Sequence, residues 1–155
     1  MKKLFVCILC ALLAVSACAC GSNENTQIAN PFKDYETMEE AEKAAGFDMT
    51  VPETLDGREM TLIQVMNDEM IQVFYGEDEN RVLVRKAEGN EDISGDYTEY
   101  GETETVDVNG AKVTMKGDEG QVKAAVWTAG KYTYAVDADQ PVSRDTMAEW
   151  ISGIA

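Results

Sequence analysis

Histidine is absent from all 155 residues of this chain, and cysteine is absent after Cys20. The part beyond Cys20 therefore lacks the side chains for a Ser-His-Asp triad, a Cys-His pair, histidine acid-base catalysis or a zinc ion held by His or Cys. It cannot form an internal disulfide bond either. We expect this part of the chain not to be an enzyme. Carboxylate pairs could still catalyse a reaction on their own. However, 29 acidic residues create many pairs by chance, so no particular pair is a candidate.

Glycine-rich phosphate loops of the Walker or dinucleotide-binding type are also missing. A loop that begins at Asp92 comes nearest to a calcium-binding EF-hand, with Ser94 and Asp96 at alternating positions. However, Gly95 stands two places before the glycine that an EF-hand needs, and Thr103 occupies the position of the bidentate acid. The pattern favours an ordinary loop stabilised by Asx and Ser turns. We expect no bound metal ion and no cofactor.

Basic residues are few, since 13 Lys and Arg stand against 29 Asp and Glu, for a net charge of −16. Two of those bases, Lys2 and Lys3, precede every acid, so the part from Cys18 onward carries 11 bases and 29 acids, a net charge of −18. Phosphate backbones and anionic headgroups repel such a surface. We therefore expect no nucleic-acid partner. Cationic peptides or divalent cations would be attracted, although solubility alone also explains an excess of carboxylates.

A hydrophobic run occupies the start of the chain. Residues 4–17 (LFVCILCALLAVSA) are 14 uncharged residues that follow Lys2 and Lys3 and end in small side chains. This order is typical of a secretory signal peptide. The run is shorter than the roughly 20 residues that a permanent helix needs to cross a bilayer. We predict a signal peptide over residues 1–17.

The end of this run, Val15-Ser16-Ala17-Cys18, resembles the bacterial lipobox, in which an aliphatic residue and two small residues precede a cysteine. In proteins with a lipobox, that cysteine receives a diacylglyceryl group and becomes the new N-terminus, and two acyl chains suffice for stable anchoring. The resemblance implies a lipoprotein held by Cys18 on the outer face of the cell membrane. Cys20 is the alternative lipidation site, because two small polar residues follow it. A third alternative is ordinary secretion without a lipid, because Ala17-Cys18-Ala19 also fits an A-x-A signal-peptide cleavage site.

Residues 18–30 are small and polar and predict a flexible tether, while residues 31–155 predict a single domain. Thr37-Met38-Glu39-Glu40 has the form of a capping box and Gly46 suits a helix stop, so a helix is expected between them. A second helix is expected after Ser143 as its N-cap. Its apolar stripe must cover part of a sheet. The stripe consists of Met147, Trp150, Ile151 and Ile154.

The segment between the two helices predicts antiparallel strands. Two of them flank Asn109-Gly110, the strongest hairpin signal in the chain. A further turn is expected at residues 117–120. Other alternating β-rich runs occupy residues 59–66, 70–75, 81–86, 121–128 and 131–136. The expected fold class is α+β, with about seven strands in meander order and with an N-terminal helix and a C-terminal amphipathic helix packed on the sheet.

Aromatic residues gather in the predicted strands, where they could line an apolar groove. They are Phe74, Tyr75, Trp127, Tyr132 and Tyr134. Core packing under the C-terminal helix explains the same residues and is favoured, because the apolar stripe of that helix needs a partner. A groove would require that Trp150 and Ile151 leave the Trp127 and Tyr134 faces open.

The order of several short pieces along residues 37–154 carries a family resemblance. The pieces are Ala41 with Ala44-Ala45-Gly46-Phe47, Val51-Pro52, Val73-Phe74-Tyr75, Asp92-Ile93-Ser94-Gly95-Asp96-Tyr97, Val106-Asp107-Val108-Asn109-Gly110, Trp127 with Gly130 and Tyr132-Thr133-Tyr134, and the helix after Ser143. They resemble an uncharacterised domain family of Gram-positive bacterial lipoproteins, which also occurs in extracytoplasmic parts of some anti-sigma factors. The resemblance implies the fold above and an envelope binding or sensing module. It carries no catalytic signature and no functional residues.

These patterns predict a membrane-anchored extracytoplasmic lipoprotein that acts as a non-catalytic binding or sensing module of the cell envelope. Its expected partners are the membrane, through the covalent lipid anchor, and an envelope protein, peptide or other ligand. The alternative is a carrier or binder of an apolar ligand or lipid in a groove on the sheet.

Overall fold

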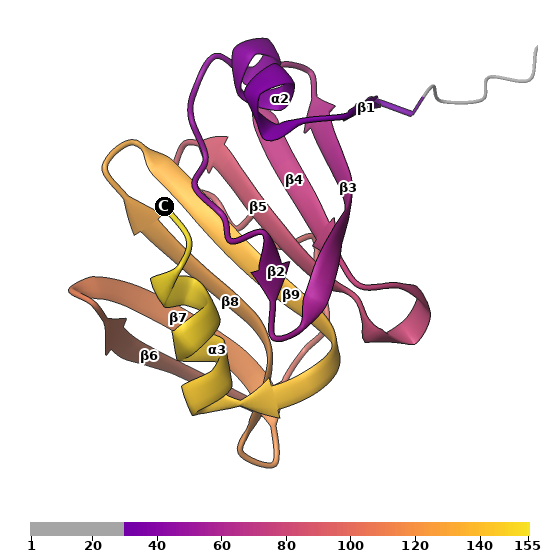
Figure 1. Ribbon diagram of the computed structural model, residues 1–155. Coiled ribbons are helices and arrows are strands. Elements are labelled where there is room, and N and C mark those ends of the chain that lie inside the picture. Colours follow the sequence, from indigo (N-terminus) through magenta and orange to yellow (C-terminus); the bar gives the residue numbers. More distant parts are fainter. Residues whose placement is uncertain (1–29) are drawn as a thin grey trace, which may run out of the picture.

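The computed structural model describes residues 30–155, and within this part the chain forms nine strands and two helices (Figure 1). The strands are β1 (Phe32–Tyr35), β2 (Thr54–Leu55), β3 (Arg58–Met66), β4 (Met70–Tyr75), β5 (Val82–Glu88), β6 (Glu102–Val108), β7 (Ala111–Asp118), β8 (Gln121–Ala129) and β9 (Tyr132–Ser143). The helices are α2 (Met38–Ala45) and α3 (Arg144–Ser152), and a short 3-10 turn, η1 (Asp78–Asn80), precedes β5. An antiparallel sheet with a helix near each end of the described part agrees with the expected fold class.

The strand order corrects the expected single meander of about seven strands. Neighbouring strands pair in the order β1-β3-β4-β5-β9-β8-β7-β6, and β2 pairs only with β3. Two meanders, β3-β4-β5 and β6-β7-β8-β9, are thus joined edge to edge where β5 pairs with β9. The two additional strands, β1 and β2, have four and two residues and are too short to show an alternating pattern.

The predicted caps and turns explain where the local elements begin and end. The Thr37 hydroxyl accepts a hydrogen bond from the Glu40 amide, and Gly46 adopts φ 79°, so α2 has the expected start and stop. Ser143 likewise accepts a hydrogen bond from the Thr146 amide at the start of α3. Asn109-Gly110 forms the tight turn between β6 and β7. Within residues 30–155, no helix has the length and apolar character to span a bilayer.

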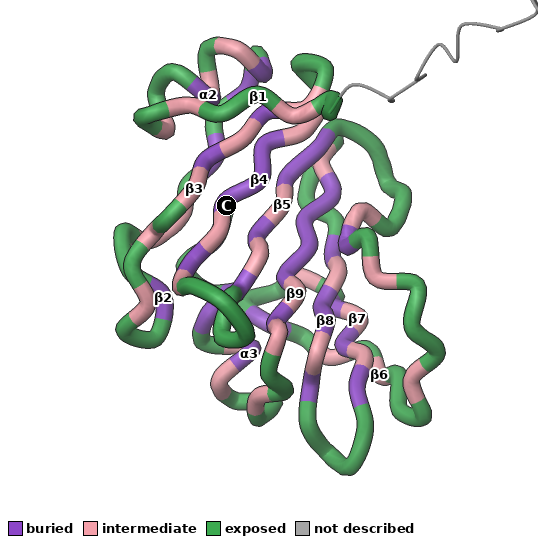
Figure 2. Tube along the Cα trace, turned by 90° about the vertical axis from the view of Figure 1, so that its right-hand side faces the viewer, coloured by how far each residue is buried: buried purple, intermediate pink, exposed green. Residues whose placement is uncertain are grey.

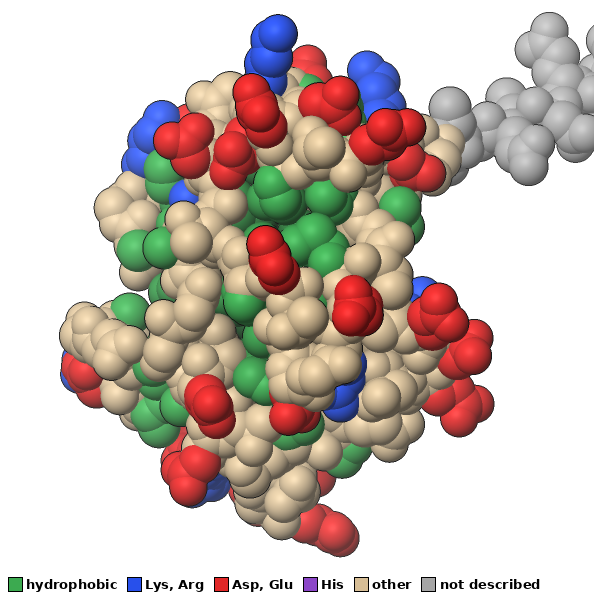
Figure 3. All heavy atoms as spheres, in the orientation of Figure 1, with side chains coloured by type: hydrophobic (Ala, Val, Ile, Leu, Met, Phe, Trp, Pro, Cys, Tyr) green, Lys and Arg blue, Asp and Glu red, His purple; other side chains and the backbone are tan. Residues whose placement is uncertain are grey.

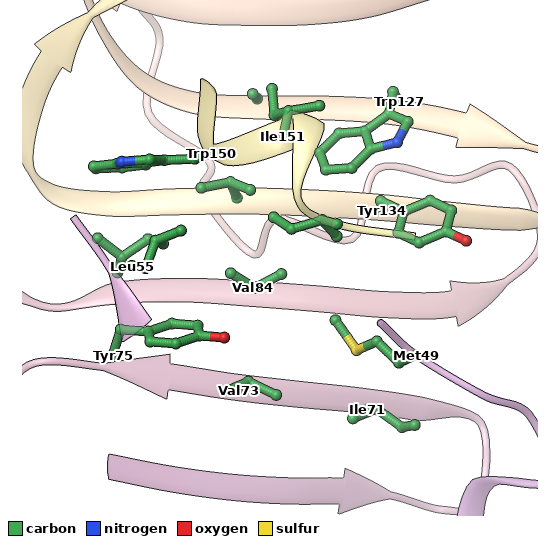
Figure 4. Close-up of a cluster of buried hydrophobic side chains, with 14 of the residues drawn as sticks. Met49, Leu55, Ile71, Val73, Tyr75, Val84, Trp127, Tyr134, Trp150 and Ile151 are labelled. Carbon is green, nitrogen blue, oxygen red and sulfur yellow. The ribbon is translucent and has the colours of Figure 1, made fainter. Parts of the chain in front are cut away.

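Both helices contribute to one apolar core, α2 through Ala41 and Ala45, and Figure 4 shows the part of this core under α3. A row of paired residues crosses the middle of this face from β3 to β7, and every member is buried. The row consists of Ile63, Val73, Val84, Val136, Ala125 and Met115. From α3, Met147, Trp150 and Ile151 pack onto this face with at most 4% of each residue exposed. The stripe expected on the C-terminal helix therefore covers the sheet as predicted.

The opposite face of the sheet carries no helix of the described part. It is crossed instead by the segment of residues 89–101 that connects β5 to β6 (Figure 2). Side-chain hydrogen bonds tie this segment to the sheet, because Arg85 of β5 bonds to it. The helix-bearing side, seen in Figure 3, carries scattered acidic side chains that are densest at the end with α2.

Candidate functional site

The five aromatic residues that could line a groove, and for which core packing was the favoured explanation, do not all share one face of the sheet. Phe74 and Tyr75 are consecutive in β4, so their side chains point to opposite sides of the sheet. Tyr75 is fully buried in the core, where its hydroxyl donates to the Pro52 carbonyl at 2.6 Å. Phe74 lies half-buried on the loop side, with the Arg81 guanidinium 5.8 Å from its ring centroid. No single face of the sheet therefore carries all five aromatic residues.

Trp127 and Tyr134 lie together on the core side, stacked with ring centroids 5.2 Å apart and with 5% and 4% of each residue exposed. Ile151 of α3 lies beside this stack, while Trp150 covers a more distant part of the core, towards Leu55 (Figure 4). The space left beside Trp127, Tyr134 and Ile151 has a volume of about 210 Å³. This is below the roughly 300–1,000 Å³ of small-molecule pockets, so the aromatic cluster resembles packed core more than a lipid groove.

Tyr132 belongs to a second aromatic cluster, which surrounds a buried lysine. The Lys86 ammonium lies 4.7 Å from the Tyr132 ring centroid and 5.0 Å from that of Tyr134. It donates a hydrogen bond to the Asp48 carbonyl at 2.7 Å, and only 6% of Lys86 is exposed. The rings offer their negative faces to this cation. The cluster therefore satisfies Lys86 internally and leaves no open aromatic site.

A crevice of about 300 Å³ opens on the loop side of the sheet, between strands β5, β8 and β9 and the segment of residues 94–100. Most of its lining is polar or charged, which distinguishes it from the core-side space. The lining residues are Leu83, Arg85, Ser94, Gly95, Asp96, Thr98, Tyr100, Lys123 and Asp137. Polar groups that converge in a concavity can fix the orientation of a bound ligand. We take this crevice as the candidate functional site.

A larger hollow of about 430 Å³ lies beside the β3–β4 turn. Its charged members, Asp68, Glu69 and Glu88, are all acidic and all exposed. Solvated acids on a turn are explained by solubility, and no basic side chain meets them in the lining. This hollow therefore offers weaker evidence for a specific ligand than the crevice does.

Arg85 is fixed at the base of the crevice by a chain of side-chain hydrogen bonds that crosses four strands. Its Nε donates to Gln72 at 3.0 Å, Gln72 donates to Gln64 at 2.6 Å, and Gln64 donates to Asp34 at 2.6 Å. The Arg85 Nη1 atom donates to the carbonyls of Ile93 and Ser94 at 3.0 and 2.7 Å. The guanidinium thus holds the loop against the sheet. Burial lowers the pKa of Arg85 from its ordinary value, although the nearby charge of Asp137 opposes this shift.

Gly95 allows the loop to approach Arg85 this closely. Its backbone has φ 71°, and a Cβ atom at this position would lie 2.4 Å from the Arg85 Nη1 atom. Any other residue would force the loop or the guanidinium to move. The glycine is therefore a structural requirement of the crevice wall.

The loop holds Asp96 through the short-range turns that its sequence predicts. The Ser94 amide donates to the Asp92 carboxylate at 2.9 Å, and the Thr98 amide donates to the Asp96 carboxylate at 2.9 Å. The Tyr100 hydroxyl also donates to Asp96. Burial by itself raises the pKa of Asp96, but the hydrogen bonds from Thr98 and Tyr100 outweigh it and hold that pKa below its ordinary value. Burial, together with the Asp96 charge, raises the pKa of Tyr100 to about 12.

Asp137 is the charged group of the crevice with the least support from its surroundings. Its half-buried carboxylate makes no hydrogen bond and no ion pair within residues 30–155. Burial, followed by the negative charges of Asp96 and Asp139, raises its pKa, and the positive charges of Lys123 and Arg85 act in the opposite direction. Asp96 and Asp137 therefore have pKa values shifted in opposite directions. Two deeply buried acids, both with raised pKa values, would have favoured carboxylate catalysis, and the crevice does not have this arrangement.

The sequence does not indicate the crevice. It places Asp96 in a loop, and Arg85, Lys123 and Asp137 belong to no motif. The one available signal was the alternation of strand β5, which places Arg85 on the polar side of the predicted strand. Within the described residues, no group of three or more acidic, His or Cys side chains could hold a metal ion. The lipidation candidates Cys18 and Cys20 lie outside the described residues.

No protein-family model, no curated protein and no solved structure matches this chain. The resemblance to the lipoprotein domain family therefore stays a prediction from sequence pattern.

Proposed function

We propose that this chain is an extracytoplasmic lipoprotein, anchored to the outer face of the membrane by Cys18 or Cys20, and that it is a non-catalytic binding module. Its ligand site is the crevice on the loop side of the sheet. The observation that carries this proposal is the crevice, whose loop wall is held to the sheet by Arg85. Charged side chains of both signs line a concavity on the face that no helix of the described part covers.

The contrast between the two faces supports a binding role for the loop side. Around the stacked Trp127 and Tyr134 the core face is covered by α3, and the space left beside them is about 210 Å³. The loop side keeps open volume, and beside it Tyr97 has 96% of its surface exposed. Large exposed aromatic residues are frequent in binding surfaces because they bury much area at low entropic cost. The apolar-carrier alternative receives less support from these volumes.

Lipid anchoring is tested by growing cells with an alkyne-bearing fatty acid and detecting label on the chain, followed by mass spectrometry of its N-terminal peptide. We expect a diacylglyceryl cysteine at position 18 in the wild type. The Cys18→Ala and Cys20→Ala variants distinguish the two sites, and the double variant should lose both label and membrane association. An unmodified wild-type N-terminus would overturn this part of the proposal.

The binding surface is tested by hydrogen exchange with mass spectrometry on the full chain in detergent, with and without a low-molecular-weight extract of the cell envelope. We expect slower exchange in residues 89–101 and in the adjoining parts of β8 and β9. The α3 segment serves as the internal control and should not change. Unchanged exchange in the loop, or equal protection of α3, would contradict a ligand site on the loop side.

A further inference from the structure

The four charged side chains that line the crevice sum to zero. Arg85 and Lys123 carry positive charge, and Asp96 and Asp137 carry negative charge. This local balance differs from the surface as a whole, since the part of the chain from Cys18 onward carries a net charge of −18. A neutral crevice in an acidic protein points to a ligand that presents both signs of charge.

The two bases keep unused hydrogen-bond donors. The Arg85 Nε and Nη1 atoms bond to protein acceptors, whereas its second terminal nitrogen, Nη2, makes no hydrogen bond in the part of the chain that the structure describes. The Lys123 ammonium has three donors, and it gives one to the Asp139 carbonyl at 2.6 Å. These spare donors suit a carboxylate, which can accept from both bases at once.

The crevice also keeps an unused acceptor. Asp137 of β9 pairs with Leu83 of β5 on one side and with Ala124 of β8 on the other. Its carboxylate receives no hydrogen bond among residues 30–155. Its oxygens are not among the buried side-chain atoms that lack a partner in the described residues, so they stay open to solvent or to a ligand. An ammonium group placed here would supply the missing donors. Asp96 differs, because Thr98 and Tyr100 already donate to it.

Charge and size together select the class of ligand. A simple anion would be repelled by the acidic surface and would leave Asp137 unpaired, whereas a simple cation would meet Arg85 and Lys123. A volume of about 300 Å³ is at the lower end for ligand pockets and suits a small molecule. We propose that the crevice binds a small zwitterion of the α-amino-acid class, with its ammonium on Asp137 and its carboxylate on Arg85 and Lys123. This inference rests on the proposed function, of which it specifies the ligand.

The rest of the lining indicates which amino-acid side chains fit. Leu83 contributes apolar surface and Thr98 contributes a small polar side chain. The one remaining charge of the lining, Asp96, already accepts hydrogen bonds from Thr98 and Tyr100, so a charged side chain of the ligand has no unused partner. Glycine, alanine and serine are therefore the appropriate probes.

The inference is tested by isothermal titration of the full chain in detergent with alanine, N-acetylalanine and alaninamide, and with glycine and serine as further amino acids. The acetyl group removes the positive charge of alanine, and the amide removes its negative charge. We expect saturable binding of the free amino acids with one site per chain. Both derivatives should bind at least about tenfold more weakly, because each loses charge-assisted hydrogen bonds.

Matched variants assign the binding to the crevice. Asp137→Asn and Lys123→Gln should each weaken alanine binding about tenfold or more. Asp107→Asn and Lys112→Gln make the same charge changes in an exposed pair on β6 and β7, 3.1 Å apart, and should leave binding unchanged. Urea unfolding of each variant confirms that it is folded.

Absent alanine binding, equal binding of the two derivatives, or equal losses in the crevice and control variants would each overturn the assignment of a zwitterion. If residues 89–101 were nevertheless protected by envelope extract, the binding module would stand and only its ligand class would be wrong. If neither alanine nor extract protected the loop, both proposals would fail together.

Discussion

Two neighbouring rows of residues, one position apart along the same strands, give the two faces of the sheet opposite characters. On the core face, Ile63, Val73 and Val84 belong to a row that is buried from β3 to β7. On the loop face, Gln64, Gln72 and Arg85 form a row joined by hydrogen bonds. The same strand pairing thus aligns both rows. The core-face row stabilises the fold by burying apolar side chains, and the loop-face row holds the Arg85 guanidinium in place.

The two rows should contribute differently to the free energy of unfolding. Full burial of a Val or Ile side chain stabilises the fold by about 1.5–3 kcal/mol. A hydrogen bond between side chains contributes only about 0.5–1.5 kcal/mol net, because water competes for the same groups. We therefore expect substitutions on the core face to reduce stability and substitutions on the loop face to act mainly on the crevice.

The largest effect is expected for Trp150→Ala, which removes the widest side chain that α3 places on the core face. With 4% of Trp150 exposed, the loss should be about 3–5 kcal/mol in the free energy of unfolding, measured by urea denaturation. Glu149→Ala changes the preceding, exposed residue of the same helix and should cost less than about 0.5 kcal/mol. Similar losses for the two variants would show that α3 is not the cover of the core.

A smaller loss is expected on the loop side for Gly95→Ala, because its Cβ would collide with the pinned Arg85 guanidinium. We expect a loss of about 1–3 kcal/mol and faster amide exchange in residues 89–101. Gly130→Ala is the control, since Gly130 also has a positive φ, 62°, but faces open space. If both variants lost the same stability, the close approach to Arg85 would not matter.

The Asp137→Asn variant should become more stable relative to the wild type as pH rises. Burial raises the pKa of Asp137 in the folded chain above the ordinary value of 3.8. Between these two values the unfolded chain has already released the proton that the folded chain retains, so the wild type loses stability with rising pH. The asparagine has no such titration. Urea midpoints of both proteins across this acidic range test the sign. A stability of the variant that fell relative to that of the wild type as pH rose would contradict it.

The smallest change in stability is expected for Tyr97→Ala, because 96% of Tyr97 is exposed. The free energy of unfolding should change by less than about 0.5 kcal/mol. Tyr100→Phe should cost more, since it removes the hydroxyl that donates to Asp96. Both are measured by urea denaturation. A large loss for Tyr97→Ala would mean that the Tyr97 side chain packs against the domain and is not exposed to solvent.

Local elements were predictable because their signals are local. The caps at Thr37 and Ser143 and the turn at Asn109-Gly110 act over a few residues, and each predicted element is present. The extent of β9 was not predictable, because its second half contains Asp, Gln and Pro, which are poor strand formers. Pairing of Val142 with Val122 of β8 extends the strand there.

The crevice depends on a pairing that leaves no trace in either strand alone. Asp137 lines the same crevice as Arg85 only because β9 returns to pair with β5, and the loop with Asp96 folds over that junction. Amphipathic alternation identifies which side chains share a face but does not identify the neighbouring strand. For this reason the sequence indicated a loop at Asp96 without indicating the carboxylate that faces it.

The position of β9 also has a consequence for how the molecule is assembled. It is the last strand of the described residues, yet it lies in the middle of the sheet between β5 and β8. A polypeptide that emerges with its N-terminus first, from a ribosome or across a membrane, cannot join its two meanders until β9 is free. Until then β5 and β8 each expose an edge that needs a partner, which favours chaperone binding and delays completion of the fold.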